Sequence, residues 1–312
     1  MLACFCIVLI WGCMEEKEDL IRLEIGLTDT LPISVPVSLD IDTGLNNDIV
    51  LVEMRNGDSR EIPFQVQGDK LWFNLGPQNG ASEKAEIFIK KGRSTTDYGE
   101  LTAVDDDGDL HLIHNDKPLL SYRYAMTYPP KGVDSIFKKS GYIHPLLTPK
   151  GDTLTRIQPP DHYHHYGIWG PWTHTRIKDS LVDFWNLGEG MGTVLFKDFK
   201  STTSGNVFTA FDALQEHFDF KTEKSPQVAL NESLHVALWN LGRTDRYMFD
   251  YTSTINSPLE NGILLEAYRY GGGIGMRFTE RWHKDNCTVL TSEGNDRLTA
   301  DGTNARWCIV SG

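Results

Sequence analysis

Residues 207–221 read VFTAFDALQEHFDFK: the stretch begins as an apolar run and then alternates apolar and aromatic residues with polar ones. Comparable long stretches follow at 232–241, 246–255 and 263–282. None of them has the i, i+3, i+4 spacing of an amphipathic helix, so we predict long β-strands. Long strands rich in bulky aromatics and joined by long loops favour a large antiparallel sandwich.

The N-terminal part of the sequence contains shorter strand patterns. Apolar residues alternate with others from Ile33 to Ile41, which predicts a strand, and Pro36 predicts that it lies at a sheet edge. Similar runs, separated by turn residues, lie at 49–54, 62–66, 71–75 and 85–90. We therefore expect a small β-sandwich over residues 20–92, followed by a polar linker over 93–108.

The second domain is expected over residues 109–312. It should open with a hairpin whose strands, 110–115 and 119–124, flank Asp116-Lys117-Pro118, and 179–187 should form a short helical turn. Near the end, 305–310 has the pattern of a strand with no closing element after it, so we expect the last strands to be missing. The predicted fold class is all-β throughout.

Composition restricts the function classes. Of the 312 residues 40% are hydrophobic and 11% aromatic, which is enough to fill a core. The formal net charge of -13 argues against nucleic acid as a partner, because phosphate contacts need a basic surface.

The N-terminus predicts export. Residues 2–12 are an apolar run too short to span a bilayer, and Ile10-Trp11-Gly12-Cys13 resembles a lipobox. We expect residues 1–13 to act as a lipoprotein signal peptide, Cys13 to be lipidated, and the protein to stay in the cell envelope, touching the membrane only through that lipid. A buried N-terminal strand is the alternative. Cys287 and Cys308 would form a disulfide or remain separate thiols.

A histidine-rich stretch carries the candidate chemistry. Five of the ten histidines lie between residues 144 and 174, among Gly, Pro and Trp, and this density in a loop-rich region is typical of a binding cleft. The densest part is 161–167, DHYHHYG.

Three interpretations of these imidazoles remain open. His162 and His164 point the same way in an extended backbone and could bind a divalent metal, with a third ligand from His144, His174 or Asp161. Alternatively, His164 or His165 carries a proton as general acid or base, because imidazole titrates near neutral pH. The third possibility is that the imidazoles only satisfy buried loop carbonyls.

The aromatic and polar neighbours favour a sugar ligand. Flat aromatic faces pack against the C–H surface of a sugar ring, planar polar groups bind its hydroxyls, and an arginine would suit an acidic sugar. The alternative is that the tryptophans belong to the core. Charged residues within 263–282, such as Arg277 and Glu280, could point into the cleft, but such charges more often lie on a solvated face. Our candidate substrate-binding residues are Arg123, His144, Arg156, Asp161, Tyr166, Trp169, Asp183 and Trp185.

Several motifs together resemble a known family. They lie at residues 144–146, 155–156, 160–167, 183–185, 291–294 and 305–307. Over most of the chain after about Leu110, it resembles a bacterial domain family of unknown function (DUF6807-type), often labelled "methane oxygenase PmoA". The resemblance implies a β-supersandwich like that of galactose mutarotase, in secreted proteins linked to polysaccharide use, whose members continue past the end of this chain.

These observations lead to one expected function and two alternatives. We expect an exported lipoprotein that acts on oligo- or polysaccharide, at a sugar C–O or C–H bond, by histidine acid/base catalysis. Lyase, hydrolase and epimerase chemistry all fit that description. The alternatives are a noncatalytic glycan-binding lipoprotein and the metal-dependent oxygenase that the family label suggests.

Overall fold

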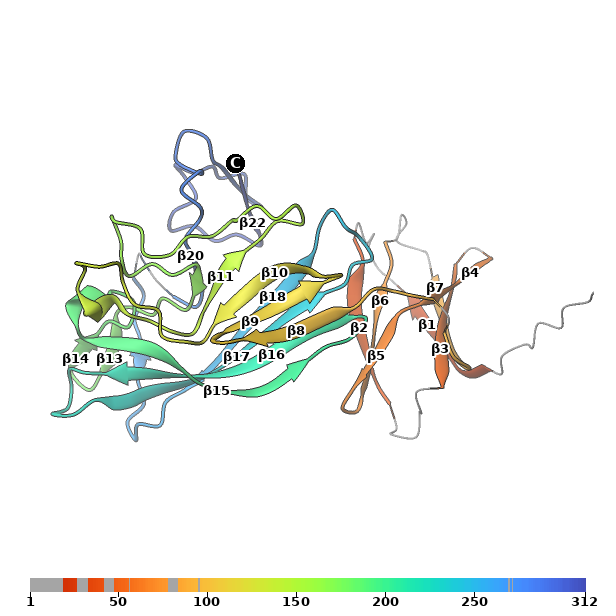
Figure 1. The fold of residues 1–312 in the computed structure, drawn as a ribbon, viewed down its shortest axis with the longest axis horizontal. Helices are drawn as coiled ribbons and strands as arrows, with labels where there is room; N and C mark the ends of the chain where they lie inside the picture. The colour runs from red at the N-terminus through yellow and green to blue at the C-terminus, as the bar shows by residue number, and fades with distance from the viewer. Residues whose placement is uncertain are drawn as a thin grey trace, which may run out of the picture. The chain divides into compact units, whose positions relative to one another are not determined.

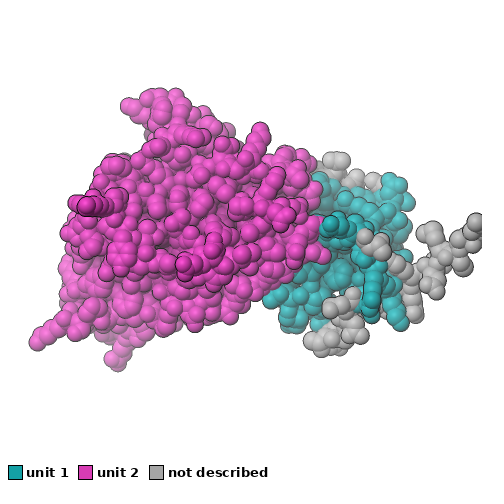
Figure 2. Space-filling model, in the orientation of Figure 1, with its two compact units in different colours: residues 1–98 teal, residues 99–312 magenta. Residues whose placement is uncertain are grey.

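The computed structural model describes residues 19–26, 33–41, 48–55, 57–77, 84–94, 96–268, 270 and 272–312. Residues 1–98 and 99–312 form two compact units, coloured separately in Figure 2. The expected signal peptide and Cys13 lie outside the described residues. In the described part, no helix is both long and apolar enough to cross a membrane.

The first unit is a sandwich of two antiparallel sheets (Figure 1). Buried side chains from both sheets, such as Leu51, Phe73 and Ile87, meet in one core, because alternate residues of each strand point inward. Val35–Asp40, which contains Pro36, lies at a sheet edge as predicted. One sheet has the order β1 (Asp19–Gly26), β7 (Lys84–Lys91), β3 (Ile49–Arg55), β4 (Asp58–Ile62), and the other β2 (Val35–Asp40), β6 (Lys70–Leu75), β5 (Phe64–Gln67).

The second unit contains a six-stranded antiparallel sheet. The predicted hairpin is present, but its turn is shorter than expected and consists of Asn115 and Asp116, both with the positive φ that such turns require. Lys117 and Pro118, expected in the turn, begin the second strand. Residues 101–106, within the expected linker, form the edge strand β8. The order is β20 (Gly275–Met276), β12 (Ile168–Trp169), β11 (Tyr142–Leu146), β10 (Lys117–Arg123), β9 (Asp109–His114), β8 (Leu101–Asp106).

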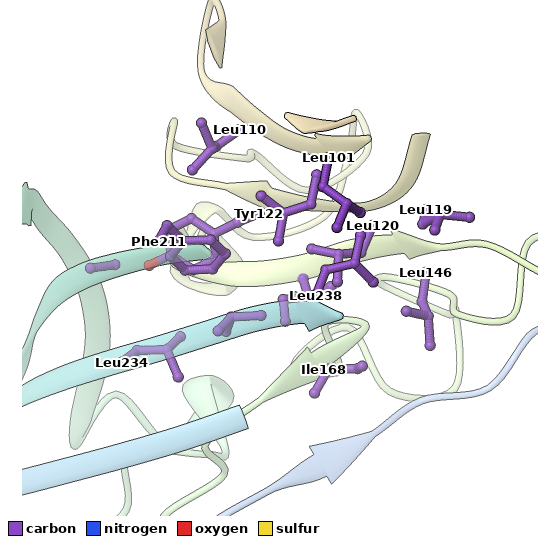
Figure 3. Packing of buried hydrophobic residues seen from close by; sticks show 14 residues of the cluster. Leu101, Leu110, Leu119, Leu120, Tyr122, Leu146, Ile168, Phe211, Leu234 and Leu238 are labelled. Carbon is purple, nitrogen blue, oxygen red and sulfur yellow. The ribbon is translucent and has the colours of Figure 1, made fainter. Parts of the chain in front are cut away.

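A four-stranded sheet of long strands packs against it. Phe211 of β16 points into the shared core beside Leu234 and Leu238 of β17 (Figure 3). Ala213 belongs to the same cluster, and Asp212 and Leu214 next to it are partly exposed. Tyr122, from the six-stranded sheet, packs against Phe211, with ring centroids 4.7 Å apart and 37° between the planes. The alternation at 207–221 thus marks a sandwich strand, as predicted. The order is β15 (Gly192–Thr203), β16 (Phe208–Asp219), β17 (Gln227–Trp239), β18 (Met248–Asn256).

Farther along these strands the buried residues become polar. Glu232 accepts hydrogen bonds from His217 Nε2 at 2.8 Å and from Ser253 Oγ at 2.6 Å. Lys139 is also buried and donates to the carbonyl of Val194 at 3.2 Å. Burial lowers the pKa of Lys139 to about 8, whereas the charge of Glu232 opposes that shift.

Smaller elements complete the unit and correct two predictions. The expected strand over 263–282 is not one strand: among the residues of this stretch that the structure describes, β19 (Leu264–Leu265) and β20 are the only strands. The expected helical turn over 179–187 is strand β14 (Ser180–Val182), with a 3-10 turn following at Leu187–Glu189. β13 (Thr175–Ile177) pairs with β14 and β19, β21 (Thr288–Thr291) pairs with β22 (Cys308–Ser311), and a second 3-10 turn covers Ser135–Phe137.

Cys287 and Cys308 are free thiols, so of the two possibilities the disulfide is not formed.

Candidate functional site

The histidine-rich loop folds back on itself between two backbone bridges. The N–H of Gln158 donates to the carbonyl of His165 at 2.8 Å, and the N–H of His165 donates to the carbonyl of His162 at 3.0 Å. Ile157 pairs with Tyr166 at the base of the loop. This closure brings the imidazoles of a short sequence stretch onto one turn.

Gly167 is required where the loop returns to the sheet. Its φ is +51°, a conformation that L side chains rarely adopt, and an added Cβ would lie 2.0 Å from the carbonyl oxygen of Ile143. Its carbonyl accepts the N–H of Arg277 at 2.7 Å, and its own N–H donates to the carbonyl of Arg156 at 3.0 Å. The glycine therefore allows the loop to lie close against β11 and beside residues 156 and 277.

Three imidazole rings converge in this loop. The centroids of His162 and His165 are 4.7 Å apart and nearly parallel, and those of His164 and His165 are 4.6 Å apart and perpendicular. His162 is exposed, whereas His164 and His165 are partly buried. The imidazoles predicted from sequence to act together do lie together.

Asp161 and Arg277 fix the loop. Asp161 Oδ2 accepts from His162 Nδ1 at 2.7 Å, so Nε2 of His162 faces away from the pair. Arg277 Nη2 donates to both oxygens of Asp161, at 3.1 and 2.9 Å, and Nη1 donates to Nδ1 of His165 at 3.3 Å. These contacts hold the pKa of Asp161 well below its usual value, with the His162 hydrogen bond contributing most.

Burial keeps the inner imidazoles neutral. It lowers the pKa of His164 to about 4 and that of His165 to about 3, and the nearby histidines and Arg277 add to both shifts. Because His165 Nδ1 accepts a hydrogen bond from Arg277, the proton of its neutral ring lies on Nε2. That Nε2 is buried and has no hydrogen-bond partner within the described residues.

Tryptophans flank the imidazoles. Trp185 stacks on His165, with ring centroids 5.8 Å apart and 14° between the planes, and meets His164 edge-on at 5.3 Å. Trp169 is 6% exposed and lies 5.4 Å from His165. Indole Nε1 of Trp185 is buried and, like His165 Nε2, has no partner in the described part of the chain. Buried polar groups are almost always hydrogen-bonded, so these two nitrogens are notable.

Two other predicted site residues, Tyr166 and Asp183, make hydrogen bonds within the fold around the site. The Tyr166 hydroxyl is buried between the carbonyl of Phe137, to which it donates, and Gln158 Nε2, from which it accepts at 2.5 Å. Asp183 accepts the N–H groups of Trp185 and Asn186 at 2.7 and 2.8 Å. Asp183 thereby orients Trp185.

Arg123 and His144 lie on adjacent strands behind the loop. Arg123 Nε donates to the carbonyl of His144 at 2.9 Å, and His144 Nδ1 bonds to Thr155 Oγ1 at 2.9 Å. Burial, followed by the charge of Arg123, lowers the pKa of His144 to about 4. Both side chains are thus already engaged within the fold.

A hollow of about 500 Å³ opens beside the loop. Asp161 and Arg277, which tie the imidazoles together, also form part of its wall, as do Arg156 and Glu280. Arg156 Nη2 lies 3.4 Å from Glu280 Oε2. The candidate site therefore consists of an imidazole cluster and an adjoining charged hollow that share two residues.

The donor set does not fit a metal centre. In the part of the chain that the structure describes, no three His, Cys, Asp or Glu side chains are grouped to hold a metal ion. His162 and His164 are near each other, with ring centroids 5.5 Å apart, but Asp161, one of the candidates for the third ligand, is hydrogen-bonded to His162 and Arg277.

A comparison with protein families assigns this region. The model of a family of unknown function (DUF6807) matches residues 109–312, more than half of the chain. The chain belongs to this family. The DUF6807 region contains the imidazole cluster, both flanking tryptophans and the hollow. A search of curated proteins found no match.

Arg277 is the site residue that sequence reasoning undervalued. It lies 116 residues after Asp161 in the sequence, yet contacts both Asp161 and His165. From the sequence, Arg277 is expected to be one of several charges on a solvated face of a strand. The short pairing of β12 with β20 and the backbone hydrogen bonds of Arg277 with Arg156 and Gly167 place it beside the loop, and neither can be recognised from a local pattern.

Proposed function

We propose that this DUF6807 protein acts on carbohydrate, at a sugar C–O or C–H bond, by proton transfer through its imidazole cluster. The observation that carries the proposal is the convergence of His162, His164 and His165 beside Trp185, next to a hollow large enough for a small saccharide. Aromatic platforms with adjacent polar donors are the combination that sugar rings need.

The histidines and their neighbours have different proposed roles. His164 and His165 are the proposed proton carriers, and burial keeps both neutral near pH 7. His165 would accept a proton only once its Nδ1 is released from Arg277. Asp161 is already bonded to His162 and Arg277, so its proposed role is to hold the His162 ring in one orientation. Arg156, at the wall of the hollow, would orient the substrate.

The unpartnered nitrogens favour a ligand with hydroxyl groups. His165 Nε2 and Trp185 Nε1 are donors without partners in the described chain. A small movement of the loop would let sugar hydroxyls accept from them, which would remove the cost of leaving buried donors unsatisfied.

A noncatalytic glycan-binding protein is the second candidate. The low pKa values of His164 and His165 favour it, because a group that titrates near 3 or 4 is a weak base at neutral pH. No observation favours the oxygenase named in the PmoA label, since that chemistry needs a ligand set that the described residues do not form.

We further propose that the protein is anchored in the cell envelope by a lipid on Cys13, which would place the site where extracellular or periplasmic oligo- and polysaccharides are present. The support is the lipobox-like sequence ahead of an acidic segment. Replacing Cys13 with Ser should release the protein from the membrane fraction on cell fractionation.

The functional test is to incubate the protein with a panel of oligosaccharides and to measure product formation by mass spectrometry. We expect His164→Gln and His165→Gln to lose at least about tenfold in rate, since general acid/base groups contribute on that scale or more. His235→Gln is the matched control, because His235 of β17 pairs with Asp212 of β16 and not with any residue of the loop. Binding without turnover in the wild type would favour the noncatalytic candidate, and equal rates in all variants would reject the acid/base role.

A further inference from the structure

The hollow beside the imidazole cluster is rich in arginine. Three arginines line it, Arg156, Arg277 and Arg297, against two carboxylates, Asp161 and Glu280. The chain as a whole has a formal net charge of -13. An excess of cations in one concave region of an acidic chain is therefore a local feature and does not follow from composition.

The three arginines differ in how far they are already paired. Arg277 is engaged by both oxygens of Asp161. Arg156 has one contact of 3.4 Å with Glu280, whose side chain is 72% exposed, so solvent weakens this pair. Arg297 forms no hydrogen bond or ion pair with any described residue, although it faces the hollow. Two guanidinium groups thus remain available to an incoming anion.

The remaining wall is apolar and aromatic. Phe278 and Trp282 stack with ring centroids 5.4 Å apart and 28° between their planes, and Met276 lies beside them in the wall. A simple inorganic anion would make no use of such a surface. A ligand that combines an apolar ring face with a negative group uses both the aromatic wall and the guanidinium groups.

We infer that the hollow binds the anionic substituent, a carboxylate or a sulfate, of an acidic saccharide, through Arg156 and Arg297. This inference rests on the proposed function and narrows its substrate class. The saccharide would place its negative group between the two guanidinium groups and extend past Asp161 and Arg277 toward the imidazoles. Arginine suits this role because its planar fork binds carboxylate and sulfate oxygens in pairs.

The test is isothermal titration of the full chain with three probes: an oligogalacturonate, a sulfated galactan oligosaccharide and a neutral cello-oligosaccharide. We expect at least one acidic probe to bind about tenfold more tightly than the neutral one, the scale of one charge-assisted hydrogen bond. Added salt should weaken the acidic probe selectively. The carboxylate and sulfate probes, compared with each other, identify the anion.

Arg297→Gln is the decisive variant, because Arg297 supports nothing else in the described chain and the fold should tolerate the change. It should remove the preference for the acidic probe and leave neutral binding unchanged. Arg281→Gln is the control: it removes the same charge from a nearby side chain that is 79% exposed and outside the hollow. Neutral binding without an acidic preference would overturn this inference alone, whereas binding of no saccharide would overturn the proposed function with it.

Discussion

Replacing Glu232 with Ala should destabilise the second unit strongly. Glu232 is 2% exposed and is hydrogen-bonded to His217 and Ser253. Its loss would leave Lys139, which is 3% exposed, as a buried cation without its counter-charge. Removing one partner of a buried ionic group costs about 3–5 kcal/mol in free energy of unfolding, and we expect a loss in that range.

The assay is urea unfolding at neutral pH. Glu232→Gln keeps the shape and should lie between wild type and Glu232→Ala. Adding Lys139→Met to Glu232→Gln should recover part of the loss, because the unpaired cation is then gone. A loss below about 1 kcal/mol in Glu232→Ala would refute the reasoning, since it would mean that water reaches the cluster at little cost.

The same cluster predicts how stability depends on pH. The pKa of Lys139 is about 8 in the folded protein and that of an exposed lysine is about 10.4. Between these values the unfolded chain binds more protons, so this group should make the free energy of unfolding rise as pH increases from about 8. Lys139→Met should flatten that rise.

Three further outcomes are expected. Gly167→Ala should lower the melting temperature and saccharide affinity together, because its Cβ would clash with the carbonyl of Ile143; an unchanged melting temperature would contradict this. Phe211→Ala should cost about 3–5 kcal/mol in urea unfolding, as a fully buried aromatic in the sandwich core. Since the pKa values of His164 and His165 are near 4 and 3, saccharide binding should stay constant between neutral pH and about pH 5 and fall below that; a step near pH 6.5 would show ordinary, solvated imidazoles.

Sequence pattern predicted the sheets well where one face of a strand is buried. The alternation at 207–221 indicates a strand locally, although its polarity follows burial only in the first half: Phe211 and Ala213 are buried, and farther along so are Gln215 and His217. The hairpin was predicted, but its turn lies at Asn115 and Asp116, one residue earlier than expected. The prediction of one long strand over 263–282 was wrong. The apolar residues of this stretch resemble a strand, but Gly272 has a φ of +119° and the chain there is mostly irregular.

The site was predictable only in its local part. His162, His164 and His165 share one turn of chain, so their grouping follows from sequence proximity. The contact of Arg277 with the loop depends on short backbone pairings across more than a hundred residues, which no local pattern encodes. Conversely, Asp183 was predicted to bind substrate, but its carboxylate accepts hydrogen bonds from backbone N–H groups within three residues.

A crystal structure of the protein with a bound oligosaccharide tests the proposed saccharide site most directly. We expect a sugar ring within hydrogen-bond distance of the His164 or His165 imidazole and in contact with Trp185, with the saccharide chain running into the hollow walled by Asp161 and Arg277. A saccharide bound on another surface, with the three imidazoles untouched, would contradict it.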